Sequence, residues 1–246
     1  MLWLIGGTSE SREIAKMLSN HQIEHLVTVT TPEACALYDQ INTKIKVGIL
    51  NPQQIENLIK EQKITAIVDA SHPHAQIISQ QAIDSGAPYI RYERPKINCS
   101  ASNTVEIQNI DQLIREKYLE NQRVLLAIGY KTLHQFKSLQ KKATLFTRIL
   151  PSIKSLDAAL EAGFTNDRIL AIRPPISHEL ERSIWQNWKI STVVAKSNGK
   201  TGGEHIKQQL SQELNVKLIL LTRPKIEYPR YTDNFSDILS FCIFYE

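Results

Sequence analysis

The segment Leu2-Trp3-Leu4-Ile5-Gly6-Gly7-Thr8-Ser9-Glu10-Ser11-Arg12 decides the fold of this chain. Its apolar start is long enough for one buried strand, and it leads directly into two glycines, hydroxyl residues and a helical pattern. Glycines let the backbone turn tightly, and the free amides at the start of a helix carry a partial positive charge. The segment therefore predicts a strand, a turn that suits a phosphate group, and a helix.

The phosphate interpretation of this turn has an alternative. The segment does not have the Gly-x-Gly-x-x-Gly spacing of the dinucleotide fingerprint. A plain strand-to-helix turn capped by Ser9 therefore stays open beside a phosphate site. If the turn binds a cofactor, its expected contacts are Gly6, Gly7, Thr8 and Ser9.

Short apolar segments alternate with helical patterns through the rest of the chain. The expected strands are 2–5, 25–30, 44–49, 65–69, 88–92, 124–128, 144–150, 168–172, 192–195 and 217–221. Thr31-Pro32 and Asn51-Pro52 predict helix starts with proline at the first helical position. Further helices are expected from near Pro73 and around 111–120, 155–162, 177–187 and 203–214. This alternation predicts an α/β fold with mostly parallel sheets and helices on both faces.

A polar stretch from Arg94 to Ser100 follows neither period and divides the pattern. We therefore expect two Rossmann-like lobes, 1–96 and 97–246, with a ligand cleft between them. The first lobe is expected to bind the cofactor, and the second to contribute to the cofactor and substrate sides of the cleft. The tail from Asp237 to Tyr245 fits either lobe.

Composition excludes several classes of protein. Of 246 residues, 42% are hydrophobic and 22% charged, which is ordinary globular usage. The net charge is +4 without a long basic run, which favours a small anionic ligand over nucleic acid. Cys35, Cys99 and Cys242 are too few and too scattered for a disulfide framework or a zinc site. Without a signal peptide or a membrane-length apolar run, a soluble cytoplasmic protein is expected.

The end of the second predicted strand bears on the choice of cofactor. An NAD site usually places an acidic residue there to hold the ribose hydroxyls, but this strand ends in Val29-Thr30-Thr31. The absence of an acid favours NADP over NAD. Arg12 and either Thr30 or Thr31 are the candidate partners of its 2′-phosphate.

A polar turn, Asp69-Ala70-Ser71-His72-Pro73-His74-Ala75, follows the fourth predicted strand, where doubly wound folds bind ligands. With Pro73 at the first helical position, Ser71 and His72 would lie at the rim of the site as cofactor contacts. A structural role for His72, fixing this loop, is an equal alternative. Two histidines without a carboxylate or cysteine pattern do not predict a metal site.

A second glycine-rich turn, Ala195 to His205, lies between a predicted strand and a predicted helix. Its glycines, hydroxyls and ammonium groups favour an anion site over a flexible loop. Arginines also stand at or just after strand ends, which together suggests a site for a polyanion: Arg91, Arg94, Arg148, Arg173 and Arg223. The candidate substrate contacts are Arg91, Arg94, Lys196, Ser197, Gly199, Gly202, Gly203 and Arg223.

In combination, these motifs resemble the precorrin-6A reductase family, including its cobalt-precorrin-6A version. The matching segments are the first turn, Asp69 to Ala75, Arg91-Tyr92-Glu93-Arg94-Pro95, Lys196-Ser197-Asn198-Gly199 with Gly202-Gly203, and Thr222-Arg223-Pro224. The sequence departs from the family pattern at Ser11, where alanine is common, at His74, where an aromatic residue is usual, and within the segment that starts at Lys196.

The resemblance implies two Rossmann-like lobes that bind NADPH and reduce one double bond of the precorrin-6A macrocycle in cobalamin biosynthesis. It also implies a tetrapyrrole-derived substrate with many carboxylates, which would account for the arginines, and it leaves room for contact with other corrin-pathway enzymes. The cofactor supplies the hydride. His72 is the candidate donor of the accompanying proton, with water or a substrate carboxyl as alternatives.

One other class remains open on the residues alone, and a further one is disfavoured because its motifs are missing. The same pattern fits a non-catalytic protein that binds a nucleotide or senses an effector. A hydrolase or epimerase would need a Gly-x-Ser-x-Gly elbow or a Tyr/Lys pair on one helix. Tyr92 and Lys96 have the Tyr/Lys spacing, but Pro95 prevents a shared helix.

Overall fold

The computed structural model of the chain describes residues 1–97 and 103–246. Cys99 and the last part of the predicted linker, from residue 98 on, lie outside these ranges. The chain forms two compact units, one of Met1–Pro95 with Pro224–Glu246 and the other of Lys96–Arg223. The chain passes from the first unit to the second between Pro95 and Lys96, next to the boundary that the sequence predicts after residue 96. The C-terminal segment Pro224–Glu246, however, belongs to the first unit, whereas the predicted second lobe, 97–246, included it.

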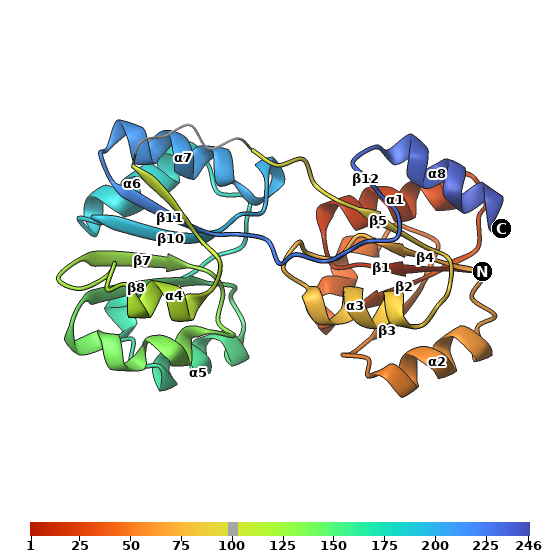
Figure 1. Cartoon of the computed structure of the whole chain (residues 1–246), viewed down its shortest axis with the longest axis horizontal. Helices are drawn as coiled ribbons and strands as arrows, with labels where there is room; N and C mark the ends of the chain where they lie inside the picture. The colour runs from red at the N-terminus through yellow and green to blue at the C-terminus, as the bar shows by residue number, and fades with distance from the viewer. Residues whose placement is uncertain (98–102) are drawn as a thin grey trace. The chain divides into compact units, whose positions relative to one another are not determined.

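The first unit is a six-stranded parallel sheet in the order β12-β5-β4-β1-β2-β3 (Figure 1). Its strands are β1 (Leu2–Ile5), β2 (His25–Val29), β3 (Lys44–Val47), β4 (Ala66–Asp69), β5 (Tyr89–Tyr92) and β12 (Tyr231–Thr232). Its helices are α1 (Ser9–Asn20), α2 (Pro52–Glu61), α3 (Gln76–Asp84) and α8 (Phe235–Phe244), with the 3₁₀ helix η1 at Pro32–Tyr38.

The core of this unit lies on both faces of the sheet. Successive side chains of a strand point to opposite faces. Leu2 and Leu4 therefore pack under α1 and α8, whereas Trp3 and Ile5 pack under α2 and α3. Because both faces are covered, β1 is apolar throughout, as is typical of parallel sheets.

Local chemistry sets the start of α2 but not that of α3. Asn51 and Gln54 form a capping box at the start of α2, with Pro52 at the first helical position, as the sequence predicts. The predicted start at Pro73 is wrong, because α3 begins at Gln76 and Ala75 makes no side-chain cap. Pro73 is instead buried in the loop after β4.

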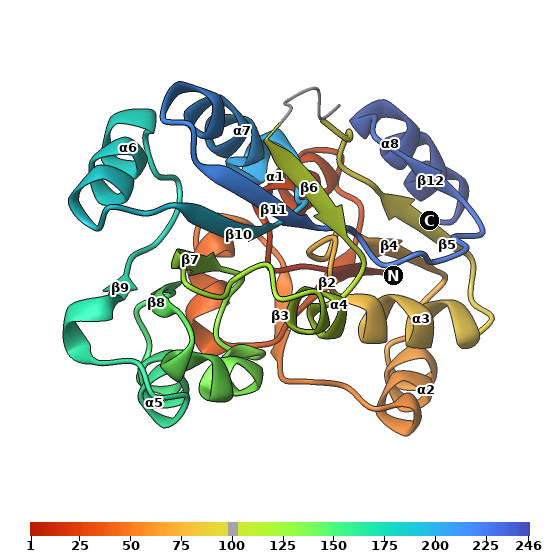
Figure 2. The ribbon, with the colours of Figure 1, turned by 60° about the vertical axis from the view of Figure 1, so that its left-hand side comes forward.

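The second unit has a six-stranded parallel sheet in the order β6-β11-β10-β7-β8-β9 (Figure 2). Its strands are β6 (Thr104–Ile107), β7 (Arg123–Ala127), β8 (Thr144–Ile149), β9 (Ile169–Ala171), β10 (Thr192–Lys196) and β11 (Lys217–Leu221). Its helices are α4 (Ile110–Arg115), α5 (Ile153–Glu161), α6 (His178–Asn187) and α7 (Glu204–Glu213), with 3₁₀ helices η2 (Leu133–Lys141), η3 (Asn166–Arg168) and η4 (Lys200–Gly202).

Both faces of the second sheet are also covered. Val124 and Leu126 of β7 belong to the apolar cluster under η2 and α5, and Leu125 belongs to the cluster under α6 and α7. The two helices α6 and α7 lie side by side (Figure 2). In the ranges 1–97 and 103–246, no helix combines the length and the apolar character that crossing a membrane requires.

Both sheets have the Rossmann strand order 3-2-1-4-5-6, but each takes its sixth strand from an unusual part of the chain. In the first sheet the sixth strand is β12, which comes from the C-terminal segment. In the second sheet it is β6, which precedes the other strands of its unit. The order reverses between β1 and β4 and between β7 and β10, and such switch points are where doubly wound sheets bind ligands.

Candidate functional site

In the first unit, the loops after β1 and β4 are tied together at the switch point. The Thr8 hydroxyl donates to the Ala70 carbonyl at 2.7 Å and accepts the Ser11 amide at 3.0 Å. Thr8, and not Ser9, is therefore the N-cap of α1, and it forms a capping box with Ser11. The two turns singled out in the sequence lie next to each other because β1 and β4 are paired in the sheet, and the Thr8 side chain links them.

The glycine pair is shaped around Tyr38, a residue that the sequence analysis missed. A Cβ at Gly6 would lie 2.4 Å from the Tyr38 hydroxyl oxygen, so only glycine fits there. Gly7 has a φ of 95° and donates its amide to that same oxygen at 2.9 Å. Ser11 Oγ lies 2.6 Å from the Tyr38 hydroxyl. Burial raises the pKa of Tyr38 despite these contacts, so the hydroxyl stays protonated.

The start of α1 keeps donors that fit a nucleotide phosphate. The Ser9 and Glu10 amides occupy the first two helical positions, which have no intrahelical acceptor. Glu10 would oppose an anion, but Arg94 Nη2 lies 2.6 Å from Glu10 Oε2, and both side chains are almost fully buried. Arg94, expected to contact substrate, is therefore engaged as the counter-ion of this turn. Gly7 and Thr8 shape the backbone, and Ser9 is exposed beside it.

The candidate partners of a ribose phosphate are exposed. Arg12 lies on the outer face of α1 and forms an ion pair with Glu13 at 2.6 Å. Thr30 follows the last residue of β2 and is also exposed. Both side chains are exposed and therefore accessible to a ligand.

Beneath the loop after β4, a buried polar network holds Asp69. Its carboxylate accepts from Arg91 Nη1 at 2.8 Å, from the Ser71 amide at 2.9 Å and from two hydroxyls, Ser79 at 2.6 Å and Tyr89 at 2.7 Å. Burial raises the pKa of the Asp69 carboxyl, but Arg91 and the hydrogen bonds outweigh burial and hold that pKa below its usual value. The Asp69 carboxylate is therefore charged and fixes the start of the loop.

Two sequence-predicted contacts, Arg91 and Ser71, belong to this network. Arg91 is 1% exposed, and its Nε also pairs with Glu93 at 3.0 Å. Its Nη1 donates to Ser71 Oγ at 3.0 Å, which holds the Ser71 side chain in the interior. These contacts correct the expectation that Arg91 offers its guanidinium to a substrate. The sequence marks Arg91 as a notable residue, but its contacts in the structure support the loop after β4.

His72 follows Ser71 in the same loop and is half-buried. Its Nδ1 accepts the His74 amide at 3.2 Å, so the proton of neutral His72 sits on Nε2. The two imidazole rings are 5.7 Å apart. Within residues 1–97 and 103–246, no three His, Cys, Asp or Glu side chains group closely enough to hold a metal ion.

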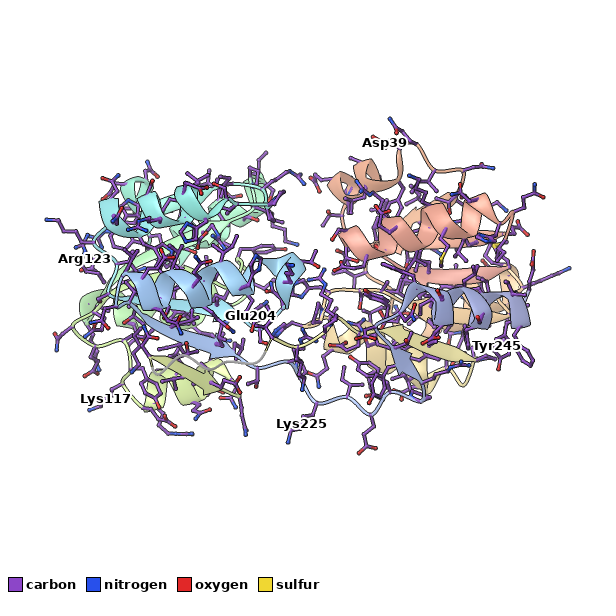
Figure 3. The ribbon with its side chains drawn as sticks, turned by 90° about the horizontal axis from the view of Figure 1, so that it is seen from above. Asp39, Lys117, Arg123, Glu204, Lys225 and Tyr245 are labelled. Atoms are coloured by element: carbon purple, nitrogen blue, oxygen red, sulfur yellow. The ribbon has the colours of Figure 1, made fainter. Side chains whose placement is uncertain are left out.

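In the second unit, the glycine-rich turn after β10 donates hydrogen bonds to an acidic residue at the start of the next helix. Glu204, labelled in Figure 3, is the first residue of α7. It accepts the Gly199 amide at 2.8 Å and the Ser197 hydroxyl at 3.3 Å. A Cβ at Gly202 would lie 2.1 Å from Asn198 Oδ1, and Gly203 has a φ of 71°. The glycines therefore serve a close approach and a left-handed cap.

Lys196 and Arg223 lie at the ends of neighbouring strands in this unit. Lys196 is the last residue of β10 and is half-buried, and its pKa is lowered by burial and by Lys131. The Arg223 Nε donates to the Ser197 carbonyl at 3.3 Å. Ser197, Gly199, Gly202, Gly203 and these two cations are thus brought to one edge of the sheet. Arg148 pairs with Glu181, while Arg173 is exposed.

Comparison with known proteins gives the family that the sequence motifs resemble, and the match extends along almost the whole chain. Residues 1–243 match the family model described as "Precorrin-6x reductase CbiJ/CobK". The cobalt-precorrin-6A reductase of Synechocystis sp. is 45% identical, with 98% of this chain and 95% of the relative aligned. That of Priestia megaterium is 30% identical, with 97% and 96% aligned.

A solved structure of CobK precorrin-6A reductase has the same fold. The two chains superpose with a TM-score of 0.81 over 99% of this chain and 96% of the other, at 18% identity. The strand order and the two switch points described above are therefore those of a known architecture. On the family match and its relatives, this chain belongs to the precorrin-6A reductase family.

Proposed function

We propose that this protein reduces one ring C=C bond of precorrin-6A, or of its cobalt complex, with NADPH as the hydride donor in cobalamin biosynthesis. The observation that carries the proposal is the family match over residues 1–243, together with a 45% identical cobalt-precorrin-6A reductase. The family is one of oxidoreductases that use a nicotinamide cofactor. A location in the cytoplasm and contact with other enzymes of the corrin pathway are parts of the same proposal.

The first unit supplies the residues for the cofactor in this proposal. The start of α1 presents the Ser9 and Glu10 amides to a phosphate, and Thr8 fixes their direction through its capping box. Arg12 and Thr30 are the partners for the 2′-phosphate. When bound, the nicotinamide supplies the hydride, so this chain needs no nucleophile of its own.

The loop after β4 completes the cofactor site in our proposal. Ser71 and Pro73 are buried and set the path of the backbone, while His72 is accessible. His72 has its exchangeable proton on Nε2, because Nδ1 accepts from the His74 amide. That proton makes His72 our candidate for protonating the carbon next to the one that receives the hydride.

The second unit supplies the residues for the substrate. Lys196, Ser197, Arg223 and the turn with Gly199, Gly202 and Gly203 offer cations and hydroxyl groups to the carboxylates of the macrocycle. An ammonium or guanidinium group bound to a carboxylate forms the stronger, charge-assisted kind of hydrogen bond. Arg91 and Arg94 are left out of this set, because Asp69 and Glu10 engage them.

Absorbance at 340 nm tests the proposal directly. Purified protein should oxidise NADPH when precorrin-6A or cobalt-precorrin-6A is added, and the product should be two mass units heavier than the substrate. Running both substrates side by side identifies the preferred one. Binding of NADPH without turnover on either substrate would instead favour the nucleotide-sensing alternative and overturn the reductase proposal.

A further inference from the structure

A pocket of about 100 Å³ opens in the second unit between the loop after β9 and the start of α7. It is smaller than the roughly 150 Å³ cavity that holds a benzene ring. Its lining residues are Arg148, Pro174, Pro175, Ile176, Glu181, Lys200, Thr201, Gly202, Gly203, His205, Ile206 and Lys207. A group of a few non-hydrogen atoms fits in this space, and a ring system does not.

The most unusual lining residue is Lys207, which is only 5% exposed. Its Nζ donates to the Gly203 carbonyl at 3.1 Å, and an ammonium has three N–H bonds to satisfy. The nearby carboxylates are engaged elsewhere: Glu181 by Arg148 and Trp185, and Glu204 by Gly199 and Gln208. Glu181 and Glu204 therefore act on the Lys207 ammonium only from a distance, and within the described residues neither forms an ion pair with it. A buried charge without a direct ion pair is costly, so the pocket suits an anion brought by a ligand.

The start of α7 adds to this attraction. The His205 and Ile206 amides stand at the second and third helical positions, where no intrahelical acceptor exists, and both residues line the pocket. The amides of the preceding loop are used internally, since Gly202 donates to Gly199 and Gly203 donates to Lys200. The donors that the lining residues can offer are therefore side-chain cations and the first turn of one helix.

One part of the lining is apolar. Pro174, Pro175 and Ile176 supply carbon surface to the same pocket as the cations. A phosphate is polar on every side and would leave this apolar part unused. A carboxylate on a short methylene arm places its CH₂ groups against prolines and its charge against Lys207, so it matches both parts of the lining.

We propose that this pocket binds one carboxymethyl or carboxyethyl arm of the macrocyclic substrate, with Lys207 as its main cation. The inference rests on the proposed function and extends it: the pocket shares Gly202 and Gly203 with the glycine-rich turn, but Lys207 and the segment 174–176 lie outside the set of substrate contacts described above. Lys207 acts here as a specificity residue that recognises a peripheral arm away from the reacting carbon.

Steady-state kinetics of Lys207→Met test the pocket, because methionine keeps the length of the side chain and removes the charge. The KM for the macrocycle should rise about ten- to a hundredfold, the range for losing one charged hydrogen bond. The kcat and the KM for NADPH should stay within about twofold. Lys141→Met, at an exposed position on η2, is the matched control and should leave all three values unchanged.

Other outcomes would overturn the inference. An unchanged macrocycle KM in Lys207→Met would show that the pocket does not hold a substrate arm. A rise in the NADPH KM alone would assign the pocket to a cofactor phosphate. If Lys207→Met does not fold, Ile176→Glu places a repelling carboxylate at the apolar part of the lining and should raise the same KM.

A binding measurement separates this inference from the reductase proposal. Uroporphyrin III carries acetate and propionate arms, and its binding can be followed by quenching of tryptophan fluorescence without turnover. Its Kd should rise by a similar factor in Lys207→Met. If the wild-type protein shows no NADPH oxidation but this difference in Kd persists, the reductase proposal fails and the pocket stands. If the two Kd values agree, the pocket inference fails.

Discussion

The Asp69 carboxylate and the Arg91 guanidinium form an ion pair with a 2.8 Å separation between Oδ1 and Nη1, at 0% and 1% exposure. Breaking a buried pair leaves one uncompensated charge, which costs far more than loss of a surface pair. The pair holds the loop that carries His72 through the Ser71 amide. Stability of the first unit and the geometry of the candidate site therefore depend on the same contact.

Asp69→Asn should lower the free energy of unfolding by about 3–5 kcal/mol, because Arg91 loses its buried counter-ion. Urea titration followed by circular dichroism measures the change. Asp167→Asn is the control, since Asp167 is exposed and lies 3.9 Å from Arg168 on η3. It should unfold at the wild-type urea concentration. Equal midpoints for the two variants would contradict the structural role given to the Asp69–Arg91 pair.

Gly7→Val should weaken NADPH binding while the protein stays folded. Gly7 has a φ of 95° and open space around its Cβ position, so the substitution strains the backbone at the first turn without a clash. Gly86→Val is the matched control, because Gly86 has a φ of 73°, an equally open Cβ position and a place after α3. Both variants should lose similar stability. Only Gly7→Val should raise the Kd for NADPH, by about tenfold or more, in a fluorescence titration; a shared, unchanged Kd would remove the first turn from the cofactor site.

NADPH should be preferred over NADH, because the residue after β2 is Thr30 and not an acid. The measurement is kcat/KM with each cofactor. Thr30→Asp should reduce the preference by about tenfold or more, since a carboxylate repels the 2′-phosphate and can hold the ribose hydroxyls instead. Thr30→Asn is the control, because asparagine has the shape of aspartate without its charge. It should keep the wild-type preference for NADPH. A wild-type enzyme that works equally well with NADH would contradict the prediction.

Lys196→Ala should raise the KM for the macrocycle about ten- to a hundredfold with little change in Tm, because Lys196 is half-buried at the end of β10. Lys141→Ala serves as the exposed comparison and should alter neither quantity. A rise confined to NADPH would move Lys196 to the cofactor site. If neither KM changes, Lys196 and its turn are removed from the list of ligand contacts.

The KM for the macrocycle should increase above pH 8. Burial and the charge of Arg148 lower the pKa of Lys207 to about 8, against the opposing effect of Glu181 and Glu204, whereas an ordinary lysine titrates near 10.4. If only the ammonium form binds a carboxylate, the KM at pH 9 should be about tenfold higher than at pH 7. Lys200 and His205 also line the pocket, so the profile is compared with that of Lys207→Met, in which this rise should be absent. A rise that persists in Lys207→Met would assign it to another group.

The sequence was informative where the chemistry is local. The start of α2 at Asn51-Pro52 follows from a cap and a proline that act within four residues, and β1 follows from its own apolar residues. The predicted start of α3 was wrong, because the loop around Pro73 is held by Asp69 and Arg91, which belong to two different strands. Tyr38 could not be predicted, since its partner Ser11 is 27 positions away. Similarly, β12 has only two residues and forms because β5 offers it an edge.

The C-terminal position of β12 and α8 has a consequence for synthesis of the protein. Ile238, Phe241 and Cys242 of α8 complete the apolar core beside β1, but they are translated only after the whole of the second unit, Lys96–Arg223. At the usual rate of translation, this side of the first sheet waits roughly seven to thirty seconds after Pro95 is added. The second unit, whose strands end at Leu221, has its whole chain available before the first unit does. On the ribosome, the unit whose synthesis begins first is therefore the later of the two to complete its fold.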